Sequence, residues 1–211
     1  MKKIIQGKVR EVYEISDKEL VVVTTDRLSA FDVILPTPVP EKGIVLNKLS
    51  SFWFNLTKDI VPNHMISEDL KDMPAEFQKP EFEGRTILVK KLKMLPYEFI
   101  IRGYVFGSMW KAYKAGEPFC GHKIEGDYKL AQKLEKPILT PSTKSSEGHD
   151  VNISIEEMKA DVGEALAEQI EDVCLKLFDR CCTYAAEKGI IIADTKLEFG
   201  LDENGSLVLA D

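Results

Sequence analysis

Acidic and basic side chains alternate in the segment Asp194-Thr-Lys-Leu-Glu-Phe-Gly200. Successive side chains of a β-strand point to opposite faces, so Asp194, Lys196 and Glu198 would share one face. Burying such a row without a ligand costs free energy, because the charged groups lose their hydration. The pattern therefore indicates a site for magnesium and a charged substrate. A row of mutually neutralising salt bridges is the structural alternative.

Two other segments could bind anions. In Gly7-Lys-Val-Arg10 the glycine lets backbone N–H groups approach a phosphate, and Lys8 and Arg10 supply charge. Taken alone, a solvated turn is the more economical interpretation of so short a pattern. Arg102 can hold a phosphate or carboxylate through two parallel hydrogen bonds, and Ser108 opens a predicted helix whose N-terminal amides favour an anion. Their proximity in sequence favours a ligand over a purely structural role.

Polar residues are also dense at residues 24–32 and 141–150. In the first segment, Arg27 could form a structural ion pair with Asp26 or Asp32. The second is rich in hydroxyl groups, contains Lys144 and Asp150, and is suited to closing over a charged ligand. A solvated surface loop is equally consistent with its composition.

The elements that must position these residues begin with three predicted strands, at residues 2–6, 8–15 and 20–25. Helical spacing predicts a helix at residues 44–59, with its aromatic side chains in the core. Strands are expected at 86–92 and 97–101, joined by a hinge-like linker, and a short helix at 108–115. Residues 117–152 are polar and are expected to form a long functional loop.

The last third has the strongest helix signal. The capping-box spacing of Asp161 and Glu164 predicts a helix start, and an apolar stripe continues to just before Gly189. Residues 190–193 form a continuous apolar run typical of a buried strand. Segments 197–200 and 207–210 flank Asn204-Gly205, which predicts a hairpin.

Composition limits the function further. The chain has 211 residues, 44% hydrophobic and 30% charged, with a net charge of −7. This acidity argues against nucleic-acid binding, which needs a basic surface. No apolar run approaches the length of a membrane span, so a cytoplasmic protein with no membrane partner is expected. The four cysteines are predicted to be reduced core residues, and no zinc site is expected.

Read in order, six motifs resemble those of the SAICAR synthetase family. They are Gly7-Lys-Val-Arg-Glu-Val-Tyr13, Thr25-Asp-Arg-Leu-Ser-Ala-Phe-Asp32, Lys42-Gly-Ile-Val-Leu-Asn47, residues 98–108, Thr140-Pro-Ser-Thr-Lys144 with His149-Asp150, and Ala193-Asp-Thr-Lys-Leu-Glu-Phe-Gly200. They cover nearly the whole chain, and the last is the most specific.

The resemblance implies an ATP-dependent carbon–nitrogen ligase that joins L-aspartate to carboxyaminoimidazole ribonucleotide (CAIR), forming SAICAR, ADP and phosphate in purine biosynthesis. It also implies an α+β, two-lobed fold related to ATP-grasp enzymes, with antiparallel sheets, packed helices and ATP between the lobes. Residues 1–94 would form the ATP-binding lobe and residues 95–211 the lobe for substrate and metal.

The resemblance also assigns roles to single residues. Lys8 and Arg10 would hold ATP phosphates, and residues 90–94, from Lys90 to Met94, would line the adenine pocket. The remaining roles are CAIR binding by Arg102 and Ser108, loop closure by Lys144 and Asp150, substrate and phosphate contacts by Asp194 and Lys196, and Mg²⁺ binding by Glu198 and Asp211.

Two departures from the family pattern are visible. Phe106 stands where the family generally has a small residue, and the family continues past Asp211, so a C-terminally truncated member is expected. The alternatives are a catalytically incomplete nucleotide-binding fragment and another ATP-dependent transferase of the same fold. A homo-oligomer is left open.

Overall fold

The computed structural model describes residues 2–30, 33–144 and 151–211, and the chain divides into two compact units. Unit 1 comprises Met1–Lys93 and Gly200–Ala210, and unit 2 comprises Met94–Phe199 and Asp211. Residues 200–210 therefore pack with the first unit, whereas the sequence placed them in the second lobe. The roles assigned to the lobes remain predictions.

Unit 1 is built on an antiparallel sheet with strand order β1-β2-β3-β7-β6. Its central strand β3 contains the run Val21-Val-Val23, whose branched side chains favour extended backbone. The strands are β1 (Lys2–Gln6), β2 (Arg10–Glu14), β3 (Glu19–Thr24), β6 (Met65–Ser67) and β7 (Thr86–Lys90).

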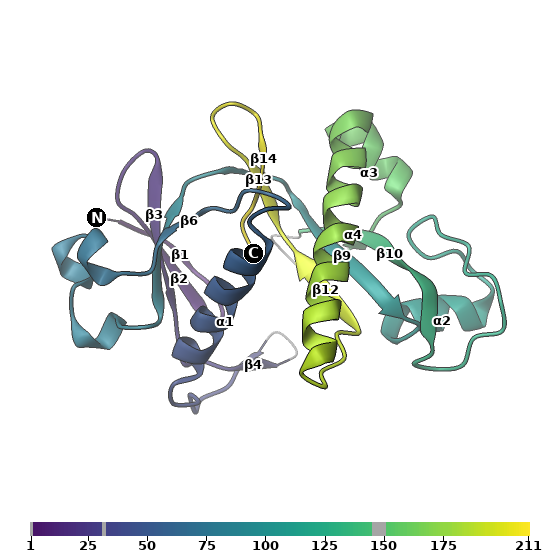
Figure 1. Cartoon of the computed structure of the whole chain (residues 1–211), viewed down its shortest axis with the longest axis horizontal. Coiled ribbons are helices and arrows are strands. Elements are labelled where there is room, and N and C mark those ends of the chain that lie inside the picture. Colours follow the sequence, from purple (N-terminus) through teal and green to yellow (C-terminus); the bar gives the residue numbers. More distant parts are fainter. Residues whose placement is uncertain (1, 31–32, 145–150) are drawn as a thin grey trace. The chain divides into compact units, whose positions relative to one another are not determined.

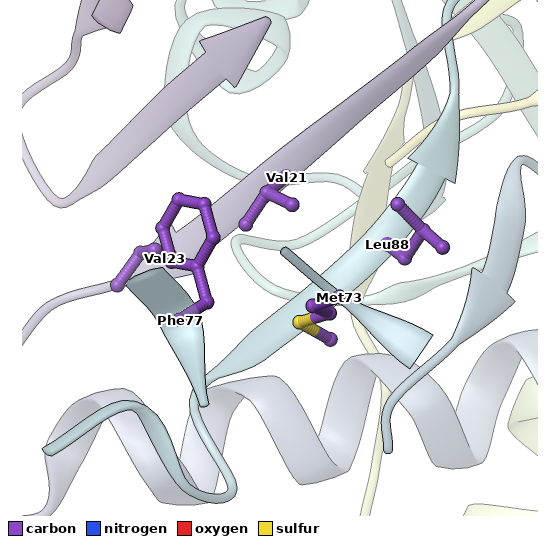
Figure 2. Close-up of a cluster of buried hydrophobic side chains, with 5 residues drawn as sticks. All are labelled: Val21, Val23, Met73, Phe77 and Leu88. Atoms are coloured by element: carbon purple, nitrogen blue, oxygen red, sulfur yellow. The ribbon is translucent and has the colours of Figure 1, made fainter. Parts of the chain in front are cut away.

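The core of unit 1 lies between this sheet and a segment of three short 3-10 helices, η1 (Leu70–Asp72), η2 (Ala75–Phe77) and η3 (Pro80–Phe82). Val21 on β3 is directly opposite Leu88 on β7, so both side chains project from the same face. Figure 2 shows them clustered with Val23, Met73 and Phe77, and all five are at most 6% exposed. This packing buries one face of the central strands.

Helix α1 (Lys42–Thr57) contacts β3, and most of its buried residues are small or polar. A Cβ atom added to Gly43 would lie 2.4 Å from the carbonyl oxygen of Thr24, so only a residue without a side chain permits this approach. The buried residues are Gly43, Asn47, Ser51, Phe54 and Thr57. The predicted core position of Phe52 is wrong, because that ring is 37% exposed.

The remaining elements of unit 1 are short. Strands β4 (Ser29–Ala30) and β5 (Val33–Ile34) form a separate pair. Strands β13 (Phe199–Leu201) and β14 (Leu207–Leu209) form the hairpin predicted around Asn204-Gly205, with Gly205 in the left-handed region at φ 78°. Strand β8 (Lys93–Met94) pairs with β13.

Unit 2 contains an antiparallel sheet with strand order β11-β10-β9-β12. Helix α3 (Ile155–Val162) contacts β10, and the long helix α4 (Glu164–Glu187) contacts both β9 and β10 (Figure 1). A Cβ atom on Gly103 would come within 3.0 Å of the Phe178 ring, so α4 packs closely on β9. The strands are β9 (Tyr97–Tyr104), β10 (Lys133–Thr143), β11 (Val151–Asn152) and β12 (Asp194–Leu197).

Helix α2 (Gly107–Ala115) follows β9 and packs over a second cluster of buried residues. The cluster consists of Val105, Met109, Phe119, Cys120 and Leu134. The four cysteines are free thiols, as predicted, but only Cys120 and Cys174 are buried in the core, and Cys181 and Cys182 are partly exposed. Burial raises the pKa of Cys120 to about 11, so its thiol is protonated at neutral pH.

Three local predictions in this unit are wrong. The expected loop at residues 117–152 contains the eleven-residue strand β10, whose prolines obscured it; Pro137 lies where the register with β9 shifts. The capping box is formed by Ser154 and Glu157, at the start of α3. Residues 190–193 form no strand, and Ile191 is 74% exposed.

Among the described residues, no helix combines the length and the apolar character needed to cross a membrane.

Candidate functional site

One face of the unit 2 sheet carries three of the predicted site residues, Arg102, Asp194 and Lys196. Along β9 the side chains alternate, and Phe99 and Ile101 are fully buried on the face that packs against α4. Glu98 and Arg102 project from the opposite face. The strand therefore presents a charged row on one side and a core on the other.

Strand register adds residues from both neighbours to this charged face. Asp194 on β12 is opposite Arg102, and Lys196 is opposite Ile100. On β10, Thr140 is opposite Ile100 and Ser142 is opposite Glu98. Because directly opposed residues project from the same face, the charged face comprises Glu98, Arg102, Thr140, Ser142, Asp194 and Lys196.

Lys196 is the centre of an ion-pair network on the charged face. Its ammonium group donates a hydrogen bond to Glu98 Oε1 and lies 3.4 Å from Glu198 Oε1. Burial acts to lower the pKa of Lys196, but the hydrogen bond with Glu98 and the charges of Glu198 and Glu98 outweigh it and raise the pKa above its usual value. The side chain is therefore a cation at neutral pH, fixed by two carboxylates.

Lys144 and Asp211 extend the network around Glu198, which lies between β12 and β13. Lys144 Nζ is 2.5 Å from Glu198 Oε2. The Glu198 N–H donates to the Asp211 carbonyl at 2.9 Å, and the Asp211 N–H donates to the Glu198 carbonyl at 3.3 Å. Residues that exchange both backbone hydrogen bonds are directly opposed, so the two side chains leave the backbone on the same side.

The pair Glu198 and Asp211 has the donor set that Mg²⁺ prefers, since magnesium usually takes one or two protein carboxylates beside water and phosphate oxygens. No cluster of three or more acidic, histidine or cysteine residues suited to a metal occurs within the described ranges. Both Glu198 oxygens are in contact with lysines. A metal ion at this carboxylate would therefore displace Lys144 or Lys196, and Lys144 is the more exposed.

The Arg102 side chain is only 13% exposed, and its contacts hold it in one orientation. Its Nε–H donates to Thr140 Oγ1 at 3.1 Å, the Thr140 hydroxyl donates to the Ile100 carbonyl, and Nη1 lies 4.0 Å from Asp194. The guanidinium also lies over the Phe119 ring at 5.2 Å. Burial lowers the pKa of Arg102 and Asp194 raises it, which leaves a desolvated cation suited to an anion.

The structure does not join every predicted residue to this network. Ser108 is exposed in the first turn of α2 and is not part of the hydrogen-bonding network around Arg102. Asp150 lies outside the described residues. Lys90 ends β7 in unit 1, and Met94 lies in β8 at the start of unit 2, 45% exposed.

The basic turn predicted to hold phosphates belongs to unit 1. Lys8 lies in the turn between β1 and β2, and Arg10 begins β2 opposite Thr24. Arg27 does not form the structural ion pair with Asp26 that was one alternative from sequence: Arg27 pairs with Glu11, and Asp26 pairs with Arg85. Asp32 lies outside the described residues.

Three residues of the charged face, Glu98, Thr140 and Ser142, had no role assigned from sequence. Glu98 could have been found, because it shares strand parity with Arg102 in a segment already recognised as a strand. Ser142 could not have been placed on this face from sequence, because the residues around it were expected to form a loop. Its buried hydroxyl has no hydrogen-bond partner among the described residues, which is unusual for a polar atom away from a ligand.

Comparison with known proteins shows which family this chain resembles. The sequence model of the SAICAR synthetase family matches residues 3–211. A phosphoribosylaminoimidazole-succinocarboxamide synthase from Lachnospira eligens is 52% identical over 99% of this chain and 73% of its own length. The solved SAICAR synthase from Saccharomyces cerevisiae complexed with SAICAR has a TM-score of 0.91 at 42% identity, covering 100% of this chain and 72% of the other.

A further solved structure, a SAICAR synthetase in complex with ADP, has a TM-score of 0.79 at 29% identity and covers 98% of this chain and 78% of the other. These likenesses, together with the antiparallel sheets and packed helices, confirm the expected α+β fold. The chain belongs to the SAICAR synthetase family.

Proposed function

We propose that this chain is the ATP-dependent ligase that joins L-aspartate to CAIR and forms SAICAR, ADP and phosphate. The observation that carries this conclusion is the 52% identity to a phosphoribosylaminoimidazole-succinocarboxamide synthase along 99% of the chain. Similarity to structures complexed with SAICAR and with ADP supports the product and the nucleotide.

The reaction proceeds in two steps. A carboxylate oxygen of CAIR attacks the γ-phosphorus of ATP, which releases ADP and leaves an acyl phosphate. The aspartate amine then attacks the acyl carbon, phosphate leaves, and the amine loses a proton as the amide forms. Both steps bring anions together, so the protein must mainly position the reactants and offset their charge.

We assign the charged face of unit 2 to CAIR and the transferred phosphate. Arg102 would bind an anionic group of CAIR, with Ser108 adding a hydroxyl at a helix N-terminus. Lys196 would offset phosphate charge, and Asp194 would orient the substrate. Lys144 and Asp150 would belong to the loop that closes over the ligands.

Glu198 and Asp211 would hold Mg²⁺, which supplies positive charge to the nucleotide phosphates when bound. Lys144 and Lys196 would neutralise the Glu198 carboxylate while the metal is absent. Glu198→Gln and Asp211→Asn should each remove the gain in ATP affinity that magnesium gives, while ATP binding without metal survives. An unchanged magnesium effect in both variants would make the network purely structural.

In unit 1, Lys8 and Arg10 would bind ATP phosphates, and the segment from Lys90 to Met94 would contact adenine. A cytoplasmic location is the prediction that an ATP-dependent ligase of purine biosynthesis suggests.

The reaction is tested by measuring ADP release with each substrate omitted in turn. Continuous ADP release should require ATP, CAIR and aspartate together, and SAICAR should form in equal amount. Equal ATP hydrolysis without CAIR would instead support another transferase of the same fold.

A further inference from the structure

The carbonyl oxygens of the turn between β1 and β2 are engaged by one short segment of unit 1. Arg27 donates from Nη2 to the Gly7 carbonyl and from Nε to the Lys8 carbonyl, both at 3.1 Å. The backbone N–H and the hydroxyl of Thr25 both donate to the Val9 carbonyl at 2.8 Å. Three consecutive carbonyls are therefore turned toward residues 25–27.

The charge of Arg27 is compensated within the same unit. Its Nη1 lies 3.0 Å from Glu11 Oε1. Glu11 also accepts a hydrogen bond from the Tyr13 hydroxyl at 2.7 Å and lies 3.0 Å from Lys3. The Tyr13 hydrogen bond, with those from Lys3 and Arg27, lowers the pKa of Glu11 to about 2 despite its partial burial. The Arg27 guanidinium is thus held in place by two carbonyls, and its charge is neutralised by Glu11, so it is not a cation available to a ligand.

Fixing these carbonyls also fixes the amides of the turn. The peptide unit is planar and trans, so its C=O and the next N–H point in opposite directions. When the Gly7 and Lys8 carbonyls face Arg27, the N–H groups of Lys8 and Val9 face the other way. A phosphate is attracted by such amides and repelled by carbonyl oxygens, so the direction of these peptides decides whether the turn can bind one.

We propose that Arg27 is a positioning residue for ATP: it turns the carbonyls of the Gly7–Arg10 turn away from the nucleotide, so that the amides and the charges of Lys8 and Arg10 meet the phosphates. The inference rests on the proposed assignment of Lys8 and Arg10 to ATP. In this proposal Arg27 itself does not contact the nucleotide.

The test compares ATP with adenosine, which has the same base and ribose but no phosphate. Arg27→Lys keeps the charge but cannot span two carbonyls, so ATP affinity should fall about tenfold, equivalent to about 1.4 kcal/mol. Adenosine affinity, followed by ligand-observed NMR, should change less than about twofold. Lys8→Ala should show the same phosphate-dependent loss.

Arg85→Lys is the matched control. Arg85 is also a partly buried arginine of unit 1 paired with a carboxylate, but its guanidinium binds the Asp26 carboxylate and not the carbonyls of the turn. This variant should leave the ratio of ATP to adenosine affinity unchanged. If Arg27→Lys does not fold, Thr25→Val removes one donor to the Val9 carbonyl and should give a smaller loss in the same direction.

The outcomes separate the two levels of the proposal. If Lys8→Ala loses ATP affinity but Arg27→Lys and Thr25→Val do not, the phosphate assignment stands and the role of Arg27 is wrong. Equal losses for ATP and adenosine in Arg27→Lys would show that the residue only stabilises the fold. Unchanged ATP binding in Lys8→Ala would overturn the assignment of the turn itself.

Discussion

Replacing Lys196 with methionine should destabilise unit 2 because it leaves two poorly hydrated carboxylates without their shared cation. The Glu98 and Glu198 side chains are only 11% and 12% exposed, whereas Lys196 is 44% exposed. Breaking a fully buried ion pair costs about 3–5 kcal/mol, and an exposed pair contributes about 0–1 kcal/mol. Water can reach the lysine end of this network, so we expect a loss of about 2 kcal/mol.

A loss of that size should lower the melting temperature by about 4–8 °C for a chain of this length. Circular dichroism during thermal and urea unfolding measures both quantities. Lys176→Met is the matched control, since Lys176 pairs with Asp172 within α4 and both side chains are more than half exposed. It should cost less than about 0.5 kcal/mol.

A double variant, Glu98→Gln with Lys196→Met, tests the cause. Glutamine needs no counter-charge, so the double variant should recover at least half of the lost stability. ADP release should stay low in both, because Lys196 is also assigned to the substrate. The reasoning is refuted if Lys196→Met is as stable as the parent, or if the double variant is no more stable than the single one.

Three further predictions concern other parts of the molecule. Because the pKa of Glu11 is lowered from 4.5 to about 2, its ionised form stabilises unit 1 above pH 4.5, and this contribution disappears as the pH falls toward 2. The difference in unfolding free energy between the parent and Glu11→Gln should therefore shrink over that interval. A difference that stays constant would contradict this prediction. Gly43→Ala should cost about 2–3 kcal/mol in urea unfolding, since its Cβ would lie 2.4 Å from the Thr24 carbonyl oxygen, and an unchanged midpoint would show that α1 moves freely. Arg102→Lys should raise KM for CAIR about tenfold and leave KM for ATP within about twofold, whereas equal changes would make Arg102 structural.

Much of this protein could be predicted from residue types and local spacing. The β-branched runs predicted β1, β2, β3 and β7, the Asn204-Gly205 pair predicted the last hairpin, and the apolar stripe predicted α4. The ordered motifs indicated the family, and alternation placed Asp194 and Lys196 on one face. These features depend on neighbours within a few residues, which the sequence displays directly.

Tertiary structure alone decided which face of α1 is buried and that a proline-bearing polar segment forms strand β10. Helical periodicity favoured the apolar face of α1, but close approach to β3 requires the face with Gly43. The register shifts near Pro137, and Pro141, which has no N–H to donate, still accepts a hydrogen bond from Ile153 through its carbonyl.

The partners of the charged residues were also decided by the fold. Alternation tells which face a side chain occupies, but strand order and register determine what lies beside it. Lys196 meets Glu98 across 98 positions of sequence, and Lys144 meets Glu198 across 54. Nothing near either residue in the sequence predicts these pairs, because the distances between their charges are set by hydrogen bonds between strands that are far apart along the chain.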